Sequence, residues 1–299
     1  MSLLVIGTLA FDSIETPYDK RENALGGSAT YFALAASSFT PVRLVGVVGS
    51  DFPDDVLSNL RDHGICTQGV EIAEGETFRW GGRYEADWNT RHTLFTHLNV
   101  FEHFDPKVPA QYTDSSYVFL ANAAPAVQMK ALEQVKNPGF VMADTMNLWI
   151  DIALDDLKQL LTKIDGLVLN DEEARLLTGE SNLLQAARKV LDLGPKLVVL
   201  KKGEHGAFLI SEHAHFALPA YPVERVVDPT GAGDSFAGGF MGYLAAAQNT
   251  DPATLKRAML YGTATASFCV EGFSVEELEK RHRGAIEERF NQLHDLVSL

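Results

Sequence analysis

Short, uninterrupted apolar runs recur along this chain, and they constrain its fold more than any other feature. Such runs are typical of strands buried on both faces of a sheet. They lie at residues 3–7, 42–48, 117–120, 139–142, 166–169 and 197–200. Helical segments stand between them, among them 29–36, 126–136 and 184–191. Strands and helices that alternate in this way predict a parallel sheet with helices on both faces, a wound α/β sandwich.

One region interrupts this alternation of strands and helices. Apolar and polar residues alternate within 77–100, and Gly81 and Gly82 stand where a turn is expected. The pattern is typical of antiparallel strands joined by a glycine hairpin turn. Although 299 residues could form two domains, an excursion of this size has too few residues for a core of its own. We therefore predict a single domain over 1–299, with a β lid inserted at about 72–105.

The lid segment carries three large aromatic residues, Trp80, Tyr84 and Trp88. They could cover a bound ligand, as the aromatic walls of many small-molecule sites do. They could equally bury the underside of the lid's own sheet. Both interpretations stay open from the sequence.

Two other segments are predicted to lie on the surface. His92, His97 and His103 are separated by five and six residues, which does not place them on one strand face, so we expect surface histidines and no metal site. The acid-rich helix expected at 275–289 is interpreted as a solvent-exposed face.

The charge of the chain limits its partners. With 25 Lys and Arg against 40 Asp and Glu, the net charge is −15, which argues against nucleic acid or an anionic membrane as the main partner. A small anion is still allowed, because backbone N–H groups can hold one. Cys66 and Cys269 form no disulfide framework or zinc spacing, which favours a reducing cytoplasm. We expect no signal peptide and no membrane span.

The most informative segment is the run VVDPTGAGDSFAGGF at 226–240. An apolar lead-in passes through a loop of small residues into a helix that is expected to reach about residue 248. Gly231 and Gly233 let an anion approach the backbone, and the loop N–H groups with the helix dipole predict an anion hole. Asp234 stands at its mouth, either as a helix N-cap or as a base that accepts a proton from a substrate hydroxyl during phosphoryl transfer.

Other phosphate-binding motifs do not occur. The chain has no G-x-x-x-x-G-K-[ST] sequence, and Phe236 stands where G-x-G-x-x-G would need its last glycine. A Walker-type ATPase and a dinucleotide-dependent oxidoreductase are therefore not expected.

The segment DPTGAGDSF at 228–236 resembles the C-terminal signature of the ribokinase-like (PfkB) carbohydrate kinases, and Gly26 and Gly27 with the following helix resemble their N-terminal signature. The resemblance implies a wound α/β sandwich with a β lid. It also implies transfer of a phosphoryl group from ATP, with Mg²⁺, to a hydroxymethyl group of a sugar or nucleoside.

The same resemblance assigns roles at the glycine-rich loop. It implies that Asp234 is the catalytic base, with Gly231, Ala232 and Gly233 as the anion hole.

On the nucleotide side, Asn170 and Glu173 match the family's N-x-x-E sequence, which implies that they organise Mg²⁺ and phosphate through water. The alternative is a solvated acidic first turn of a helix. Lys201, Gly203 and Gly206 stand where the family has a nucleotide-binding strand end and turn. Many members have Thr at the position of Lys201. The Lys201 side chain could pair with a phosphate or point to solvent.

On the acceptor side, Asp12 matches the aspartate that holds substrate hydroxyls, and a carboxylate can accept two hydrogen bonds from a diol. Gly26 and Gly27 would let the substrate approach the backbone. Many sugar-specific members have Asn near Thr30, so Thr30 is a departure at a predicted acceptor-binding position.

A monovalent-cation loop found in part of the family is also matched. Asp228 and Thr230, with main-chain atoms of 267–272, stand at its positions, which implies potassium as a candidate ion.

Three functions therefore compete. A sugar kinase is the first, a nucleoside kinase of the same family is the alternative, and a non-catalytic sugar- or nucleotide-binding regulator is the third. Lids of this family can pair between subunits, so a face with Leu94, Thr96, Leu98 and Val100 predicts a homodimer through the lid.

Overall fold

The computed structural model describes residues 2–212 and 214–298, so both end residues of the predicted 1–299 domain lie outside the described residues. Within these ranges nine strands form one large sheet, the main sheet, in the order β13-β12-β11-β10-β9-β8-β1-β4-β5. The strands are β1 (Leu3–Ile6), β4 (Val42–Gly49), β5 (Ile65–Ala73), β8 (Tyr117–Leu120), β9 (Phe140–Asp144), β10 (Gly166–Asn170), β11 (Leu197–Lys201), β12 (Ala207–Ser211) and β13 (His215–Leu218). Every apolar run named above forms one of these strands, whereas β5, β12 and β13 were not predicted.

The strands from β11 to β5 are paired in parallel, and β12 and β13 are antiparallel to their neighbours. Successive side chains of β1 point to opposite faces. Leu3 and Val5 join one hydrophobic cluster, and Leu4 and Ile6 join another on the opposite face. The sheet is therefore buried on both sides, which confirms the predicted sandwich.

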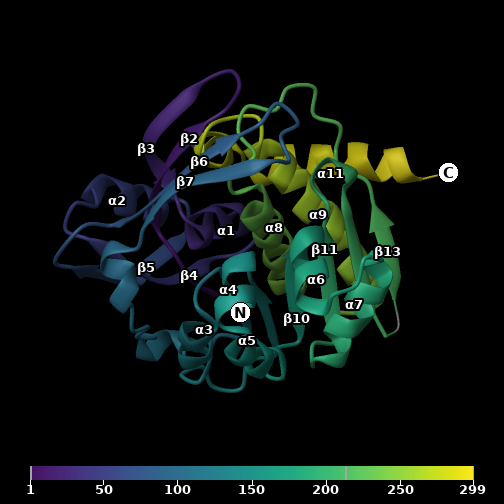
Figure 1. Ribbon diagram of the computed structural model, residues 1–299, viewed down its shortest axis with the longest axis horizontal. Coiled ribbons are helices and arrows are strands. Elements are labelled where there is room, and N and C mark those ends of the chain that lie inside the picture. Colours follow the sequence, from purple (N-terminus) through teal and green to yellow (C-terminus); the bar gives the residue numbers. More distant parts are fainter. Residues whose placement is uncertain (1, 213, 299) are drawn as a thin grey trace.

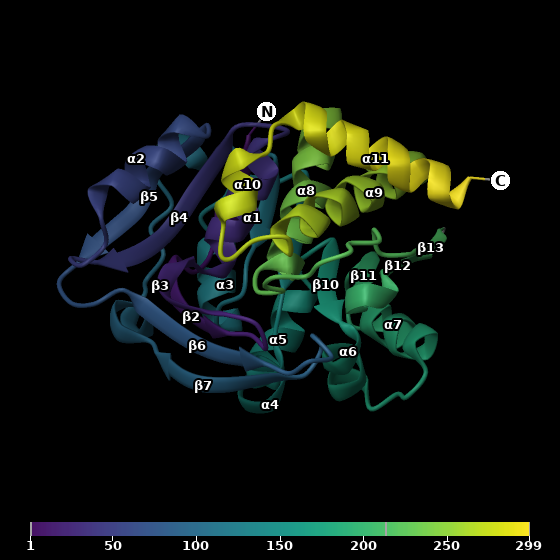
Figure 2. The same cartoon turned by 90° about the horizontal axis from the view of Figure 1, so that it is seen from above.

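Helices cover both faces of the main sheet (Figure 2). One layer contains α1 (Ser28–Ser37), α2 (Asp54–Asp62), α8 (Ala232–Ala247), α9 (Pro252–Cys269), α10 (Glu276–Lys280) and α11 (Arg283–Val297). The other contains α3 (Pro125–Leu132), α4 (Asn147–Ile152), α5 (Leu154–Leu161), α6 (Asp171–Thr178) and α7 (Leu183–Asp192). Short 3-10 turns lie at η1 (Asn99–His103), η2 (Ala110–Tyr112) and η3 (Gly203–His205). Within the described ranges, each helix is too short or too polar to span a bilayer.

A second, smaller sheet lies outside the sandwich, and we call it the lid sheet (Figure 1). In the described residues its order is β3-β2-β6-β7, formed by β2 (Ala10–Glu15), β3 (Lys20–Gly26), β6 (Phe78–Tyr84) and β7 (Arg91–His97). The predicted lid contained the 72–105 segment alone, so the prediction was incomplete. Half of the lid comes from the chain directly after β1, where β2 pairs in parallel with β6.

The predicted glycine hairpin turn was wrong in its position. Gly81 and Gly82 lie inside β6, and the turn follows later, where the Glu85 N–H donates to the Thr90 carbonyl oxygen. A Cβ at Gly81 would lie 2.3 Å from the Phe95 ring, and one at Gly82 would lie 2.1 Å from the Trp80 ring. Glycine is needed there because aromatic rings cross the strand.

The C-terminal segment has a solvated face, as predicted for 275–289, but it is not one helix and its other face is buried. It forms α10 and α11, whose apolar residues Leu278, Ile286, Phe290 and Leu293 are all buried in the main cluster. The acidic residues occupy the outer face, while this apolar stripe packs on the core.

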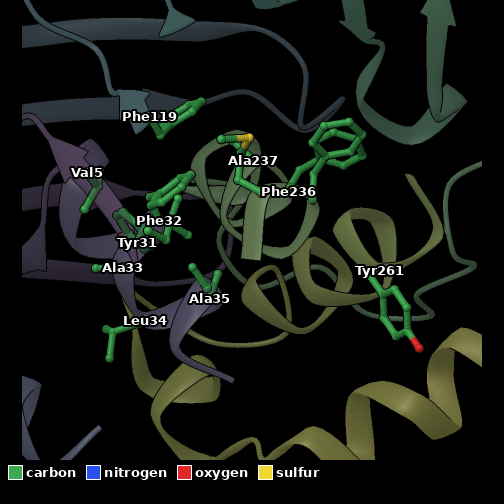
Figure 3. Close-up of a cluster of buried hydrophobic side chains, with 14 of the residues drawn as sticks. Val5, Tyr31, Phe32, Ala33, Leu34, Ala35, Phe119, Phe236, Ala237 and Tyr261 are labelled. Carbon is green, nitrogen blue, oxygen red and sulfur yellow. The ribbon is translucent and has the colours of Figure 1, made fainter. Parts of the chain in front are cut away.

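Close packing of α1 against α8 fixes the start of α8 beside the sheet. Phe32 stacks on Phe119 with ring centroids 4.2 Å apart, next to Ala237 and Phe236 of α8 (Figure 3). A Cβ at Gly238 would lie 2.4 Å from the Phe32 carbonyl oxygen. Small residues on α8 therefore allow the backbones to approach, and the glycine-rich loop that precedes α8 is held in place.

Candidate active site

The loop before α8 is built around glycine. Gly231 is the N-cap residue with φ 75°, a left-handed conformation, and a Cβ there would lie 2.3 Å from the Tyr31 ring. Asp228 closes the loop: its Oδ1 accepts the Thr230 N–H at 2.8 Å, and its Oδ2 accepts the Ser274 N–H at 3.2 Å. The loop geometry therefore depends on these residue types.

The N–H groups at the start of α8 differ from one another. The Ala232 N–H donates to the Pro229 carbonyl oxygen at 3.2 Å. Within the described chain, the N–H groups of Gly231, Gly233 and Asp234 have no main-chain acceptor. Of the predicted trio, the Ala232 N–H is therefore engaged and the N–H groups of Gly231 and Gly233 are not, while the Asp234 N–H interacts with its own carboxylate; the anion hole itself stays a prediction.

Asp234 is the third residue of α8, and the interpretation of Asp234 as an N-cap was wrong, since Gly231 caps the helix. Its side chain is half-buried. The pKa of Asp234 is raised to about 8, mainly by burial and then by the Asp144 carboxylate, with the Lys201 ammonium opposing both. A carboxyl with such a pKa can hold and release a proton near neutral pH.

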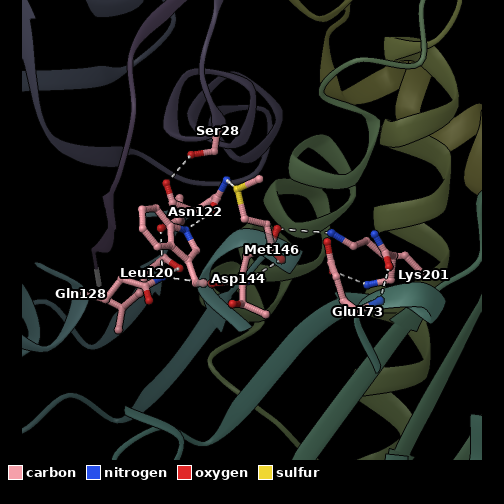
Figure 4. Close-up of polar contacts among 12 residues, drawn as sticks. Ser28, Leu120, Asn122, Gln128, Asp144, Met146, Glu173 and Lys201 are labelled. Atoms are coloured by element: carbon pink, nitrogen blue, oxygen red, sulfur yellow. Dashed lines mark hydrogen bonds and ion pairs between the residues drawn. The ribbon is translucent and has the colours of Figure 1, made fainter. Parts of the chain in front are cut away.

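The sequence left open whether Lys201 pairs with a phosphate or points to solvent. In the structure it does not point to solvent. It ends β11, and its Nζ lies 3.3 Å from Oδ2 of Asp144, which ends β9 (Figure 4). The side chains are 19% and 7% exposed, respectively. A Cβ at Gly233 would lie 2.9 Å from this Nζ, so the ammonium stands beside the start of α8.

Asn170 and Glu173 form a capping box at the start of α6. Asn170 Oδ1 accepts the Glu173 N–H at 2.8 Å, and Glu173 Oε2 accepts the Asn170 N–H at 2.8 Å. Glu173 is buried, so the solvated-turn alternative was wrong for it. Burial raises the pKa of Glu173 to about 7, and the Lys201 ammonium opposes the shift. The N-x-x-E spacing could have been interpreted as a capping box from sequence.

The turn after β11 needs both predicted glycines. Gly203 has φ 54° and Gly206 has φ 82°, and a Cβ at Gly206 would lie 2.0 Å from the Leu218 carbonyl oxygen. The lid reaches this turn: Asn89, between β6 and β7, donates from Nδ2 to Glu204 Oε1 at 3.3 Å. The lid turn and the predicted nucleotide turn are therefore in contact.

On the other side of α8, Asp12 lies in β2 and is buried. A Cβ at Gly26 would lie 2.0 Å from Asp12 Oδ2, so glycine makes room for this carboxylate. Gly27 has φ 95° and packs against the Thr8 carbonyl oxygen. Burial raises the pKa of Asp12 to about 7, and the Asp228 carboxylate adds to the shift.

Tyr31 was missed by the sequence analysis, which singled out its neighbour Thr30. Both side chains are buried, and within the described residues neither hydroxyl has a hydrogen-bond partner. Burial raises the pKa of Tyr31, and the carboxylates of Asp12 and Asp228 raise it further. The Tyr31 phenol thus stands near the two acids, and helical position alone gave no signal for it.

The predicted cation loop is assembled, with its oxygens engaged. Thr230 Oγ1 donates to Tyr84 Oη at 3.1 Å, and its carbonyl oxygen accepts from Cys269 Sγ at 3.4 Å. Val270 lies beside the loop, since its carbonyl oxygen accepts the Asp228 N–H at 3.4 Å. Both Asp228 oxygens already accept backbone N–H groups, and potassium stays a prediction.

The lid aromatics bury their own sheet. Tyr84 joins Ile14 and Phe273 in a small cluster against which Trp80 and Trp88 pack. Tyr84 is 8% exposed, and the two indoles are half-buried. The second interpretation is therefore confirmed for Tyr84, while the indoles keep a free surface.

The lid histidines are exposed, as predicted. His92 Nε2 lies 3.0 Å from Glu85 Oε1, and the His97 ring stacks on Phe95. In residues 2–212 and 214–298, no three His, Cys, Asp or Glu side chains are arranged to hold a metal ion.

Known proteins are similar to this chain in sequence. A family model described as pfkB family carbohydrate kinase matches residues 2–280. A cytidine kinase of Thermococcus kodakarensis is 30% identical over 248 residues, covering 81% of this chain and 87% of the relative. A nucleoside kinase of Methanothermobacter thermautotrophicus is 28% identical over 287 residues, covering 90% and 89%.

Solved structures share the fold. A nucleoside kinase of Methanocaldococcus jannaschii superimposes with a TM-score of 0.80 at 21% identity, covering 97% of this chain and 98% of that one. A ribokinase of Thermotoga maritima gives a TM-score of 0.76 at 20% identity, covering 97% and 99%. The predicted fold class is therefore confirmed.

Proposed function

Because this chain belongs to the pfkB family of carbohydrate kinases, phosphotransferases with an alcohol group as acceptor, we propose that it transfers the γ-phosphate of ATP to the hydroxymethyl group of a nucleoside. The sequence analysis placed a sugar acceptor first and a nucleoside second. Two relatives named for nucleoside acceptors align with 81% and 90% of the chain, which favours the second.

The observation that carries the proposed reaction is the place of Asp234. The charges of Asp12 on the acceptor side and Lys201 on the nucleotide side both act on the pKa of its carboxyl group. It lies beside N–H groups without a main-chain acceptor at the start of α8. A base between the two substrates can accept the hydroxyl proton as the phosphoryl group moves.

In the proposed reaction one phosphorus–oxygen bond forms, another breaks, and one proton moves to this chain. The acceptor hydroxyl oxygen forms a bond to the γ-phosphorus while the bond from that phosphorus to the bridging oxygen of ADP breaks. The hydroxyl proton passes to Asp234. The N–H groups of Gly231 and Gly233 stabilise the charge on the transferring group, the usual role of an anion hole.

Asp12 holds acceptor hydroxyls in this proposal. A buried carboxylate can accept two hydrogen bonds from the 2′- and 3′-hydroxyls of a ribose. Gly26 makes room for the Asp12 carboxylate, and the Tyr31 phenol on α1, unpartnered within the described residues, stands near it. The acceptor side therefore offers groups that a polyhydroxy ligand satisfies.

The nucleotide side carries Lys201, Gly203 and Gly206 for the phosphates and turn, with Asn170 and Glu173 for Mg²⁺. The side-chain oxygens of Asn170 and Glu173 are the hard donors that Mg²⁺ prefers. The capping box uses only one of the two Glu173 carboxylate oxygens. In this proposal the two side chains would contact the ion through water, which Mg²⁺ readily keeps. When bound, Mg²⁺ neutralises charge on the phosphate oxygens.

The lid sheet offers a surface for contact with a second subunit. Leu94 of β7 and Leu98, directly after this edge strand, are 44% and 37% exposed, a surface suited to a homodimer contact, whereas Val100 of the predicted face packs against the core. Cys66 and Cys269 are free thiols, in keeping with a cytoplasmic location.

An ADP-release screen over pentoses, hexoses, keto-sugars and nucleosides tests the proposal, with Asp234→Asn as the control for background hydrolysis. We expect cytidine or another ribonucleoside to give the highest kcat/KM and one nucleoside monophosphate per ADP. A free sugar with the higher kcat/KM would restore the sugar-kinase alternative. No release with any acceptor, together with nucleotide binding, would support a non-catalytic regulator.

A further inference from the structure

The Lys201 ammonium lies inside a group of carboxylates. Asp144, Glu173 and Asp234 all act on its charge, from β9, α6 and α8. These carboxylates raise the pKa of Lys201, against the opposing effect of burial. A lysine held this way stays charged in the reaction.

Asp144 is held in place by its own contacts. Gln128, 1% exposed, donates from Nε2 to the carbonyl oxygens of Leu120, Ala121 and Asp144, each at 3.0 Å. This amide ties the ends of β8 and β9 together. Asp144 Oδ1 accepts the Thr145 N–H at 2.8 Å, which leaves Oδ2 directed at Lys201. Neither Gln128 nor Asp144 was singled out from the sequence.

The contact between Lys201 and Asp144 is loose. At 3.3 Å it is longer than the 2.7–2.9 Å typical of a charge-assisted hydrogen bond. The ammonium also stands beside Gly233, one of the residues with a free N–H at the start of α8. An anion held by that N–H group would lie next to the ammonium and could replace Asp144 as its partner.

We propose that Lys201 is a catalytic residue that contacts the γ-phosphoryl group during its transfer, and that Asp144 is the positioning residue that holds Lys201 beside Gly233 until ATP binds. The inference rests on the proposed function, because it requires ATP as phosphoryl donor. Charge spreads over the oxygens of the transferring group in the transition state, and a fixed ammonium beside the anion hole stabilises it there. The family resemblance gives no such role, because many members have Thr at this position.

Lys201 and Asp144 also act on the base Asp234 in opposite directions. The ammonium favours its ionised form and the carboxylate disfavours it. The other groups that face this cluster are Glu173 from α6, Arg91 of the lid, which acts on Glu173, and Asp12 from β2, which acts on Asp234. They are unchanged in variants of Lys201 or Asp144, so the two variants should shift the base in opposite senses.

The first test compares Lys201→Met with Lys202→Met, using cytidine and ATP with Mg²⁺. Lys202 follows on the same strand end, and its Nζ lies 4.3 Å from the centre of the Phe208 ring, which makes it a matched control. We expect Lys201→Met to lower kcat by about 10²- to 10³-fold, with the cytidine KM within about threefold of wild type. Lys202→Met should retain wild-type kinetics. An unchanged kcat for Lys201→Met, whatever its KM for ATP, would overturn the proposal.

The second test measures kcat/KM against pH for wild type, Lys201→Met and Asp144→Asn, with melting temperatures recorded alongside. The rise of kcat/KM with pH should move to higher pH in Lys201→Met and to lower pH in Asp144→Asn. A merely structural ion pair would lower both melting temperatures without opposite shifts of the pH profile, and that result would overturn the role of Asp144. If wild type phosphorylates no acceptor, the proposed function itself fails; if wild type is active and Lys201→Met retains its kcat, this inference alone fails.

Discussion

Two clusters of buried acids flank the start of α8, and they are neutralised differently. The donor cluster, Asp144 and Glu173, surrounds the Lys201 ammonium. The acceptor cluster, Asp12 and Asp228, forms no ion pair within the described ranges, and a phenol stands near it instead of a cation. In the proposed function, the donor cluster thus supplies its own positive charge for phosphates, whereas Asp12 of the acceptor cluster requires hydroxyl donors, which a nucleoside would bring with it.

The largest expected effect tests the base between the clusters. Asp234→Asn removes the proton acceptor while it keeps the size of the side chain, so kcat should fall by about 10²- to 10⁴-fold. Binding of cytidine and ATP, measured by calorimetry, should stay within several-fold. Asp171→Asn, at a partly exposed acid in the first turn of α6, is the matched control. A near-normal kcat for Asp234→Asn would return this residue to a structural role.

Removing the cation of the donor cluster should destabilise the protein. Lys201→Met leaves buried carboxylates without their counter-charge, a loss on the order of 3 kcal/mol. The loss should grow from pH 5 to pH 8, because the pKa values of Glu173 and Asp234 are raised by burial to about 7 and 8, and both ionise over this range. Urea denaturation at several pH values measures it. A loss that shrinks as the pH rises would contradict the arrangement of charges in the donor cluster.

Removing a carboxylate from the acceptor cluster should stabilise the protein at high pH, the opposite of removing the cation from the donor cluster. Burial raises the pKa of Asp12 to about 7, so the folded protein holds a proton that the unfolded chain has released. Stability from this group therefore falls as the pH rises from about 4 to about 7. Asp12→Asn removes the penalty, and we expect it to raise the free energy of unfolding on the order of 2 kcal/mol at pH 8 and little at pH 4. A variant that is less stable than wild type at pH 8 would refute this.

The smallest expected effect concerns Glu173. Glu173→Gln keeps the capping box, because glutamine can accept the same Asn170 N–H, but it removes the carboxylate. Stability should stay close to wild type at pH 5, where the folded protein keeps Glu173 protonated, while the Mg²⁺ concentration for half-maximal rate rises several-fold and kcat falls. A Mg²⁺ titration that superimposes on that of wild type would remove Glu173 from the metal site.

The fold could be predicted where hydrophobic pattern decides it, and not elsewhere. The apolar runs of the main sheet are buried on both faces, so the sequence alone identified them. β3, with the sequence KRENALG, is mostly exposed, and β2 carries the buried Asp12, so neither shows a simple apolar pattern. Aromatic rings that cross β6 account for Gly81 and Gly82, and such contacts do not show in the sequence.

The residues of the candidate site could likewise be predicted only where a sequence motif contains them. The glycine-rich loop, Asp234 and the Asn170–Glu173 pair lie in recognisable motifs, so the sequence located them. Tyr31, Gln128 and Asp144 lie in ordinary apolar segments and gain their roles from neighbours distant in the sequence. Long-range packing therefore supplies the part of the site that motifs do not contain.

The central claim is that the start of α8 separates an acceptor side from a phosphate side. Calorimetric titration of Asp12→Ala and Lys201→Met with cytidine and with a non-hydrolysable ATP analogue tests it most directly. We predict that Asp12→Ala weakens cytidine binding by roughly 2 to 4 kcal/mol and leaves the ATP analogue unaffected, while Lys201→Met leaves cytidine binding unaffected. Equal weakening of both ligands by Asp12→Ala, or unchanged cytidine affinity, would contradict the account.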